Sequence, residues 1–309
     1  MLAAKNFEDR ELVKSQRNFD RWQAFEQSTW SYQLFSQYDD QLGVMLTAQQ
    51  NASKFTYKTL GRNGTKPQDS AESALGTGDR FLNSFNDITH WSNVYGDFAN
   101  WTHLNAALAC ASNLETYMVG VIDLAIRSAP ASLFGTKHAL DGSVLLKYGA
   151  PTFDTKDYII SCTKGDWSKR LEALEKIFGP LPLELRHQHA SLERLRKLRN
   201  NVGHAFGRNI ENAQYHGLRE LQPMERLSQK SLYSTMRACR KFAKVLDDFL
   251  LNEYVGDFEV IRFLSAHHND VTGGTLGERV MALKKAIGAT GQPRGKVYLK
   301  GLLTYWDSL

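Results

Sequence analysis

The sequence predicts an all-α protein with a helical bundle at its centre and further helical segments at both ends. Apolar residues recur at spacings of three and four in several stretches, most clearly over residues 98–128 and 228–251. Convincing alternation of period two is missing, and DYIISC at 157–162 is the one short strand candidate. Amphipathic helices without a sheet favour a bundle of four to five helices.

Changes in composition divide the chain into four consecutive segments. The stretch after residue 50 is rich in Gly, Ser, Thr and Asn and has little periodicity, which indicates a linker or mobile loop. The tail after residue 256 predicts two further helices around GATGQPRGK. The four segments are an N-terminal helical segment (1–50), helical from about residue 8, the linker or loop (51–80), the bundle (81–256) and a C-terminal helical extension (257–309).

Within the bundle, start and stop signals suggest where each helix begins and ends. The helix over 98–128 stops at Ser-Ala-Pro, and an irregular stretch follows over 131–165. DWSKRLEALEKIFGP then predicts a helix of about three turns that begins at an Asp or Ser cap and ends at Gly-Pro. Two more helices are expected over 183–199 and 228–251.

Composition narrows the class of protein. The net charge of +5 and the pI of about 9.0 are mildly basic and only weakly indicate a polyanionic partner. Three distant cysteines without metal-type spacing fit a reduced, cytoplasmic setting. The N-terminus MLAAKNFEDREL has no apolar signal-peptide core, and no apolar run is long enough for a membrane span.

Local charge is more informative than total charge. Residues 186–208 contain six Arg or Lys and one Glu, and residues 226–244 contain six Arg or Lys and no acid. Neighbouring helices of this kind would present a basic surface suited to phosphates. A solvated helix face with basic stems covering apolar surface is the alternative. The expected phosphate-binding residues are Arg186, Arg194, Arg196, Lys197 and Arg208.

The stretch RNNVGHAFG at 199–207 ends the first basic segment. On an unbroken helix, Arg199 and His204 would lie about 140° apart and could not share a site. Either the helix breaks near Gly203, where Gly and two Asn are poor helix formers, or a second copy of the chain completes the site. We expect the break or the second copy because the chemistry of these residues is complementary.

That chemistry suits metal-free cleavage of a phosphodiester. Histidine can give or take a proton near neutral pH, and arginine can hold two phosphate oxygens. An asparagine amide can orient a phosphate or hydroxyl, and Asn200 follows Arg199 directly. No carboxylate cluster nearby in the sequence offers a magnesium site, and no metal or other cofactor is expected.

Arg199, Asn200 and His204, in the order Arg, polar residue and then His, resemble the motif of the HEPN superfamily of helical ribonucleases. The preceding helix LERLRKLRNNVGHA and the apolar helix that follows match the setting, and Glu115 in NLETYMVGV resembles the acidic residue of that family's first helix. The resemblance covers about residues 98–251.

The resemblance implies a HEPN-like bundle of four to five helices that dimerises with its two motifs face to face. It implies a metal-independent endoribonuclease, a toxin or anti-phage defence effector that acts on tRNA or mRNA and is controlled by an inhibitory or trigger protein. His204 would be the general acid or base, Arg199 would stabilise the phosphorane charge, and Asn200 would position the phosphate or the 2′-hydroxyl. Glu115 and Asn201 would have supporting roles.

Other readings stay open. Many HEPN-like bundles lack activity, so a non-catalytic RNA-binding or protein-interaction module is the main alternative, and a purely structural helical adaptor is a third. RFLSAH repeats the spacing with Arg262 and His267, but it lacks the polar residue after Arg and is interpreted as a chance match. Cys110 and Cys239 fall at apolar helix positions, which favours buried structural roles.

Overall fold

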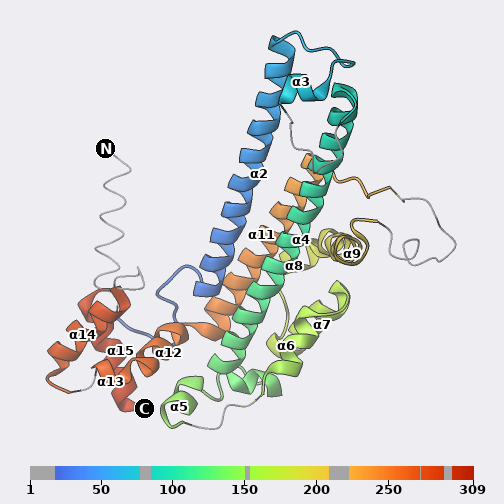
Figure 1. Ribbon diagram of the computed structural model, residues 1–309. Helices are drawn as coiled ribbons and strands as arrows, with labels where there is room; N and C mark the ends of the chain where they lie inside the picture. The colour runs from blue at the N-terminus through green and yellow to red at the C-terminus, as the bar shows by residue number, and fades with distance from the viewer. Residues whose placement is uncertain (1–17, 77–84, 150–153, 209–222, 272, 289–293) are drawn as a thin grey trace, which may run out of the picture. The chain divides into compact units, whose positions relative to one another are not determined.

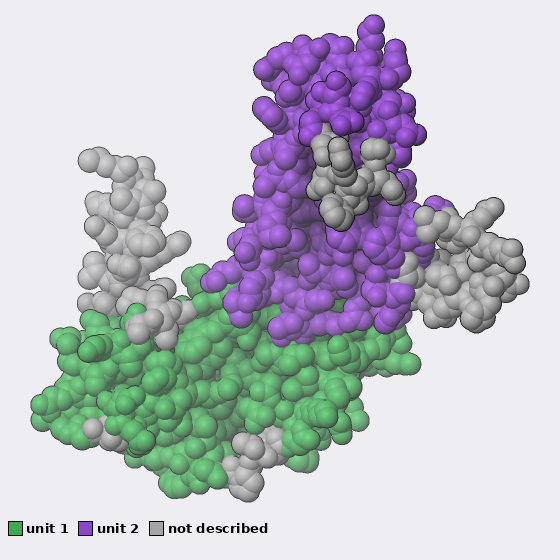
Figure 2. Space-filling model, viewed as in Figure 1, with its two compact units in different colours: residues 1–33, 117–186, 243–309 green, residues 34–116, 187–242 purple. Residues whose placement is uncertain are grey.

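The computed structural model describes residues 18–76, 85–149, 154–208, 223–271, 273–288 and 294–309. Every regular element in these residues is a helix and none is a strand, which confirms the predicted all-α class (Figure 1). The chain forms two compact units, each assembled from separated stretches (Figure 2). Unit 1 comprises residues 1–33, 117–186 and 243–309, and unit 2 comprises residues 34–116 and 187–242. The division into four consecutive segments stays a prediction, and a local sequence pattern does not indicate which distant stretches pack together.

Three long helices contribute side-by-side segments to unit 2: α2 (Trp30–Arg62), α4 (Ile88–Ser128) and α11 (Gln229–Leu250) (Figure 1). The Asn113 side-chain amide on α4 donates to the backbone oxygen of Phe35 on α2 at 3.0 Å. The Gln50 amide on α2 donates to the hydroxyl of Tyr233 on α11 at 2.7 Å. These bonds set the register of the three helices in this unit.

The C-terminal part of α2, residues 51–62, lies in the stretch that was expected to form a loop. The structure is helical to Arg62, and the short helix α3 (Ala71–Leu75) follows. Leu60 and Ala71 are buried against Ile88 and Trp91 of α4. The expectation of a loop over 51–80 is therefore wrong for this helical part, because tertiary packing overrides the weak helix propensity of Gly, Thr and Asn. Residues 77–80 lie outside the described residues.

The basic segment forms α9 (His189–Ala205), which follows α8 (Leu183–His187) after an interruption at Gln188. The single helix expected over 183–199 is thus two helices. The helix α9 continues without interruption through Gly203, so the expected break there is wrong. The added Cβ of an alanine at Gly203 would meet nothing within 4 Å, so there is room for a side chain at this position.

Unit 1 contains the remaining helices. They are η1 (Pro130–Phe134), α5 (Gly142–Lys147), α6 (Lys156–Thr163), α7 (Trp167–Phe178), the π-helical turn η2 (Leu251–Val255), α12 (Phe258–Ala266), α13 (His268–Val271), α14 (Leu276–Gly288) and α15 (Lys296–Ser308). A core of Leu264, Leu283, Leu299 and Leu302, among others, holds α12, α14 and α15 together.

The helices α6 and α7 and those of the tail differ in how well the sequence predicted them. Asp166 caps α7 by accepting the N–H of Lys169 at 3.0 Å, as the Asp cap predicted, and Gly179 follows the last helical residue. The strand candidate DYIISC is wrong, because those residues lie in α6; a short apolar run does not distinguish the two structures. The described residues of the tail form four helices, where two were expected.

The N-terminal helix begins later than expected. Residues 18–29 form turns and bends, and α2 starts at Trp30. The hydroxyl of Thr29 accepts the N–H of Tyr32 at 3.1 Å, which is the bond of an N-cap residue and explains why the helix starts here. The part of this expectation that covers residues 8–17 lies outside the described residues.

Candidate functional site

Arg199 is held by an acidic residue from a distant part of the chain. Its Nη2 lies 3.1 Å from Oε2 of Glu115 on α4, although 84 positions separate the two residues. The Glu115 side chain is 14% exposed and that of Arg199 is 33% exposed, so the ion pair is at the edge of solvent. The structure therefore brings together the motif arginine and the acidic residue that the sequence singled out separately.

Asn200 lies on the other side of the same guanidinium. Its Oδ1 accepts a hydrogen bond from Nη1 of Arg199 at 3.4 Å. A guanidinium has five N–H groups, so these two contacts leave donors that a phosphate could use. Glu115, Arg199 and Asn200 thus form one polar cluster on unit 2, in which the arginine is oriented from two sides.

His204 does not join this cluster within one chain. It is exposed, and it lies on the last turn of α9. Because α9 is continuous, the five-residue step from Arg199 turns His204 about 140° around the helix axis. Of the two conditions under which these residues could share a phosphate, the helix break is removed, and only completion by a second copy is left.

The end of α9 has an unusual backbone. Phe206 has φ of 53° and is followed by Gly207 with φ of 75°; among the described residues, Phe206 is the one non-glycine residue with positive φ. The N–H of Gly207 donates to the Asn201 backbone oxygen at 3.1 Å, and the oxygen of Gly207 accepts from Glu225 at 2.7 Å. A Cβ on Gly207 would lie 2.8 Å from Cδ1 of Leu104, so only glycine fits here.

Asn201 consequently has a structural role in this chain. Its backbone oxygen terminates α9, and its amide nitrogen lies 3.3 Å from Oε2 of Glu225. These contacts tie the end of α9 to the segment before α11. The expected supporting role of Asn201 in catalysis stays a prediction.

A basic groove lies between α9 and the first turns of α11, with a volume of about 540 Å³. Two of the expected phosphate-binding residues, Arg194 and Lys197, line it, and both are exposed. Among the described residues that line it, Glu225 is the one acid. The hydroxyls of Ser191, Ser231, Ser234 and Thr235 also line the groove, and the sequence analysis missed them. The Ser-rich start of the helix over 228–251 was the available signal.

The other expected phosphate-binding residues have partners elsewhere. Arg196 forms a two-pronged ion pair with Glu193 one turn earlier on α9. Arg186 belongs to unit 1, where its Nη2 lies 2.5 Å from Oε2 of Glu175. Arg208 folds back so that its guanidinium lies 5.3 Å from the ring centroid of Phe206. The basic segment is therefore divided among several local environments.

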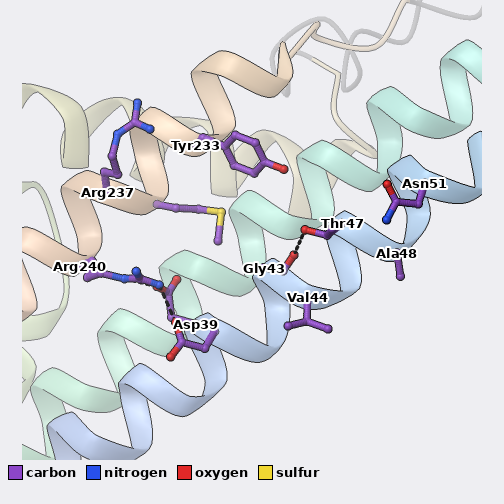
Figure 3. A pocket seen from close by; sticks show the side chains of 11 residues that line it. Asp39, Gly43, Val44, Thr47, Ala48, Asn51, Tyr233, Arg237 and Arg240 are labelled. Atoms are coloured by element: carbon purple, nitrogen blue, oxygen red, sulfur yellow. Dashed lines mark hydrogen bonds and ion pairs between the residues drawn. The ribbon is translucent and has the colours of Figure 1, made fainter. Parts of the chain in front are cut away.

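A second cavity, of about 750 Å³, lies between α2 and α11 (Figure 3). Nε of Arg240 donates to Oδ2 of the buried Asp39 at 2.7 Å, and its Nη2 donates to Asp40 at 2.9 Å. Arg237 adds a second positive charge, so the two arginines balance the two aspartates. With balanced charge and a wall of Gly, Val, Ala and Met, this cavity does not indicate a particular ligand.

The cysteines are not nucleophiles in this structure. Cys110, Cys162 and Cys239 are free and buried, which confirms the expectation for Cys110 and Cys239. Burial raises the pKa of Cys110 to about 12 and that of Cys162 to about 11, since a thiolate is poorly solvated there. The neutral thiols therefore act as small apolar core residues.

The repeated spacing at Arg262 and His267 has a structural explanation. A ring nitrogen of His267 lies 2.9 Å from the backbone oxygen of Phe263, and the imidazole stacks on the Phe263 ring with centroids 4.1 Å apart. His267 thus caps the end of α12, while Arg262 is exposed. These contacts support the interpretation of this pair as a chance match.

Comparison with protein-family models, curated proteins and solved structures finds no match to this chain. None of the helices in the described ranges has the length and apolar content needed to cross a membrane. Among the described residues, no three His, Cys, Asp or Glu side chains gather as ligands for a metal ion.

Proposed function

We propose that the protein is a metal-independent endoribonuclease with a HEPN-like bundle, whose site is composed of Arg199, Asn200 and His204 from two copies of the chain. The observation that carries this proposal is the ion pair between Glu115 and Arg199. The resemblance to HEPN ribonucleases connects an acidic residue of an early helix with the motif of a later one, and these two residues are in contact.

The residues can be assigned to steps of a transesterification. The 2′-hydroxyl of a ribonucleotide attacks the adjacent phosphorus and the bond to the 5′-oxygen breaks, which leaves a 2′,3′-cyclic phosphate and a 5′-hydroxyl. His204 transfers a proton as general acid or base. Arg199 stabilises the charge that develops on the phosphate oxygens, Asn200 positions the phosphate or the 2′-hydroxyl, and Glu115 orients the guanidinium.

The basic groove supports a polyanionic substrate. Arg194 and Lys197 are exposed on the same helix as the motif and face hydroxyl side chains of α11. Such residues can contact phosphates on either side of the scissile bond without reading the sequence. A toxin or anti-phage effector directed against tRNA or mRNA would use this arrangement.

The unbroken α9 favours a second candidate, a non-catalytic RNA-binding module. In a single chain Arg199 is engaged by Glu115, and His204 points to a different side of the helix. A bundle that lost catalysis would keep the basic groove and these structural contacts. The two candidates differ in whether His204 of one copy meets Arg199 of another.

The decisive experiment mixes two inactive variants. RNA cleavage is measured with EDTA present for the parent, Arg199→Ala and His204→Ala, each expected to lose activity by at least about 100-fold. If Arg and His come from different copies, an equal mixture of the variants regains roughly a quarter of the parent activity, because half of the dimers contain one intact site of two. A site within one chain would regain none.

Matched controls use the repeated spacing. Arg262→Ala and His267→Ala remove the same residue types at the same separation in α12 and should leave cleavage unchanged. Parent-like cleavage by Arg199→Ala or His204→Ala would refute the ribonuclease proposal. Salt-sensitive RNA binding without cleavage by the parent would establish the non-catalytic module.

A further inference from the structure

A line of aromatic rings runs along unit 2 to the end of α9, the helix that contains Arg199, Asn200 and His204. Successive ring centroids lie 5.1–6.3 Å apart, within the range of direct aromatic contact. The pairs Trp91–Tyr95 and Phe98–Trp101 are stacked, with interplanar angles of 20° and 24°. This aromatic strip consists of Tyr57 on α2, Trp91, Tyr95, Phe98 and Trp101 on α4, and Phe206 after α9.

Most of the strip is open to solvent. The exposed fractions are 42% for Tyr57, 48% for Phe98, 37% for Trp101 and 59% for Phe206, whereas Trp91 is buried and anchors the strip. Single exposed aromatic residues are common, but a contiguous line of them marks an interaction surface. The rings on α4 recur at steps of three and four, so one face of that helix presents them together.

Phe206 is kept in the strip by a strained backbone. A bulky residue with φ of 53° is unfavourable, and such strain persists where the surroundings enforce it and a function uses it. The following Gly207 is held by the hydrogen bonds to Asn201 and Glu225 and by close packing on Leu104. The strain therefore places the Phe206 ring in the open, 6.3 Å from Trp101 and two residues after His204.

Two arginines lie beside the rings, and one of them is paired with an aspartate. The guanidinium of Arg208 lies over Phe206, and that of Arg226 lies 2.7 Å from Asp97, the residue directly before Phe98. The Arg226 side chain is 69% exposed. Aromatic faces with adjacent cations match the two parts of an unpaired nucleotide, its flat base and its phosphate.

We propose that the aromatic strip binds single-stranded RNA, with unpaired bases stacked on Phe98, Trp101 and Phe206 and the backbone held by Arg208 and Arg226. This inference depends on the proposed function, because it assigns the substrate class of that site. The substrate would be RNA with unpaired bases that are not stacked within a duplex. A duplex hides the faces of its bases, so the strip selects unpaired segments beside the motif. The guanidinium of Arg208 over the Phe206 ring favours this occupant over an apolar peptide or a second copy of the chain.

The test measures binding rather than cleavage, so it can fail or succeed independently of the ribonuclease proposal. The full chain carrying His204→Ala is titrated with a labelled single-stranded RNA of about ten nucleotides and with its duplex, followed by fluorescence anisotropy. We expect at least about tenfold tighter binding of the single strand. On the same background, Trp101→Ala and Phe98→Ala should each weaken single-strand binding by about tenfold or more, since stacking contributes this much per base.

Three further variants separate stacking from folding. Trp101→Phe keeps an aromatic face and should retain most of the affinity. Phe206→Asn suits the left-handed backbone, so it should maintain or raise the thermal unfolding midpoint while it weakens binding. Phe134→Ala removes a ring that is 83% exposed in unit 1, outside the strip, and should leave binding unchanged.

Three results would overturn the proposal. Equal affinity for single strand and duplex would show that the protein recognises phosphates alone. Unchanged binding by Trp101→Ala and Phe98→Ala would remove the strip from RNA recognition. If sedimentation showed that these variants turn a parental dimer into a monomer while single-strand affinity stays unchanged, the strip would be an interface between copies.

Discussion

The two units differ in how they use polar and aromatic side chains. In unit 1, Arg21 is 4% exposed, and its guanidinium donates to Ser143, to the backbone oxygen of Val255 and to Ser128 at 2.7–3.2 Å. Unit 2 instead leaves the aromatic strip and the basic groove open to solvent. Both units join distant segments through polar contacts, but unit 2 in addition leaves aromatic and basic side chains exposed on its surface.

A second buried network in unit 1 shows the same tendency. Asp247 is fully buried; it accepts the hydroxyl of Thr29 at 2.6 Å and the hydroxyl of Tyr117 at 3.2 Å. Burial raises the pKa of Asp247 to about 6 in spite of these bonds. The buried polar residues of unit 1 and the exposed side chains of unit 2 are different residues, so mutations can test their effects on stability and on the proposed RNA binding separately.

The largest expected effect is on Arg21. Arg21→Met keeps the apolar stem but removes the ion pair with Asp141 and the guanidinium's hydrogen bonds to buried oxygens of Val255 and Ser128, so the free energy of unfolding should fall by about 3 kcal/mol. Urea unfolding followed by circular dichroism measures the change. The matched control is Lys169→Met, which breaks an exposed ion pair with Asp166 and should change stability little. If both variants lowered the free energy of unfolding by the same amount, the buried Arg21 network would contribute no more to stability than an exposed ion pair.

The next largest expected effect is a pH dependence of the free energy of unfolding that comes from Glu259. Burial raises the pKa of Glu259, which accepts the N–H of Trp30 at 3.0 Å, from 4.5 to about 7. The folded state therefore holds the proton more tightly than the unfolded chain. Stability falls as pH rises from about 4.5 to 7, and a shift of this size corresponds to about 3 kcal/mol.

Glu259→Gln should remove this component, because the amide oxygen can still accept the Trp30 N–H without a charge. The unfolding free energy of the variant, measured between pH 4.5 and 8, should have a flatter profile than the parent, apart from the slope that Asp247 contributes up to about pH 6. Identical slopes for the two proteins would show that Glu259 is not a buried titrating group.

The smallest effects concern the end of α9, where two nearby glycines should respond oppositely. Gly207→Ala should destabilise the protein by about 1 kcal/mol or more, since φ is 75° and the new Cβ would meet Leu104. Gly203→Ala should stabilise it by about 0.5–1 kcal/mol, because Gly203 lies in a helix with open space around it. A loss of stability for Gly203→Ala would instead indicate that the helix needs glycine flexibility there.

Local patterns identified several elements from the sequence. The Asp166 cap and Gly179 stop predicted α7, and the three–four periodicity over 228–251 predicted α11. Both signals lie within a few residues of the structure that they specify. The short run DYIISC was misread, because a helix segment and a strand of that length share the same composition.

The candidate site shows where local reasoning stops. The motif residues Arg199 and His204 were found from their spacing, but the expected break at Gly203 is absent, because helix propensity is a weak local preference that packing overrides. Trp101 lies in the stretch 98–128, whose apolar periodicity predicted a helix, yet it is 37% exposed. Its place in the aromatic strip depends on Phe206, from a different helix end, which periodicity does not show.

The sequence by itself determined the all-α class, the start and end of α7 and the residue types of the motif, because each of these depends on interactions within a few turns. Only the tertiary structure decided that α9 is continuous, that Glu115 meets Arg199 across 84 positions and that rings from α2, α4 and the end of α9 form one strip. Contacts between distant segments depend on how whole helices pack. The free energy of that packing is distributed over many residues, so no single local pattern predicts it.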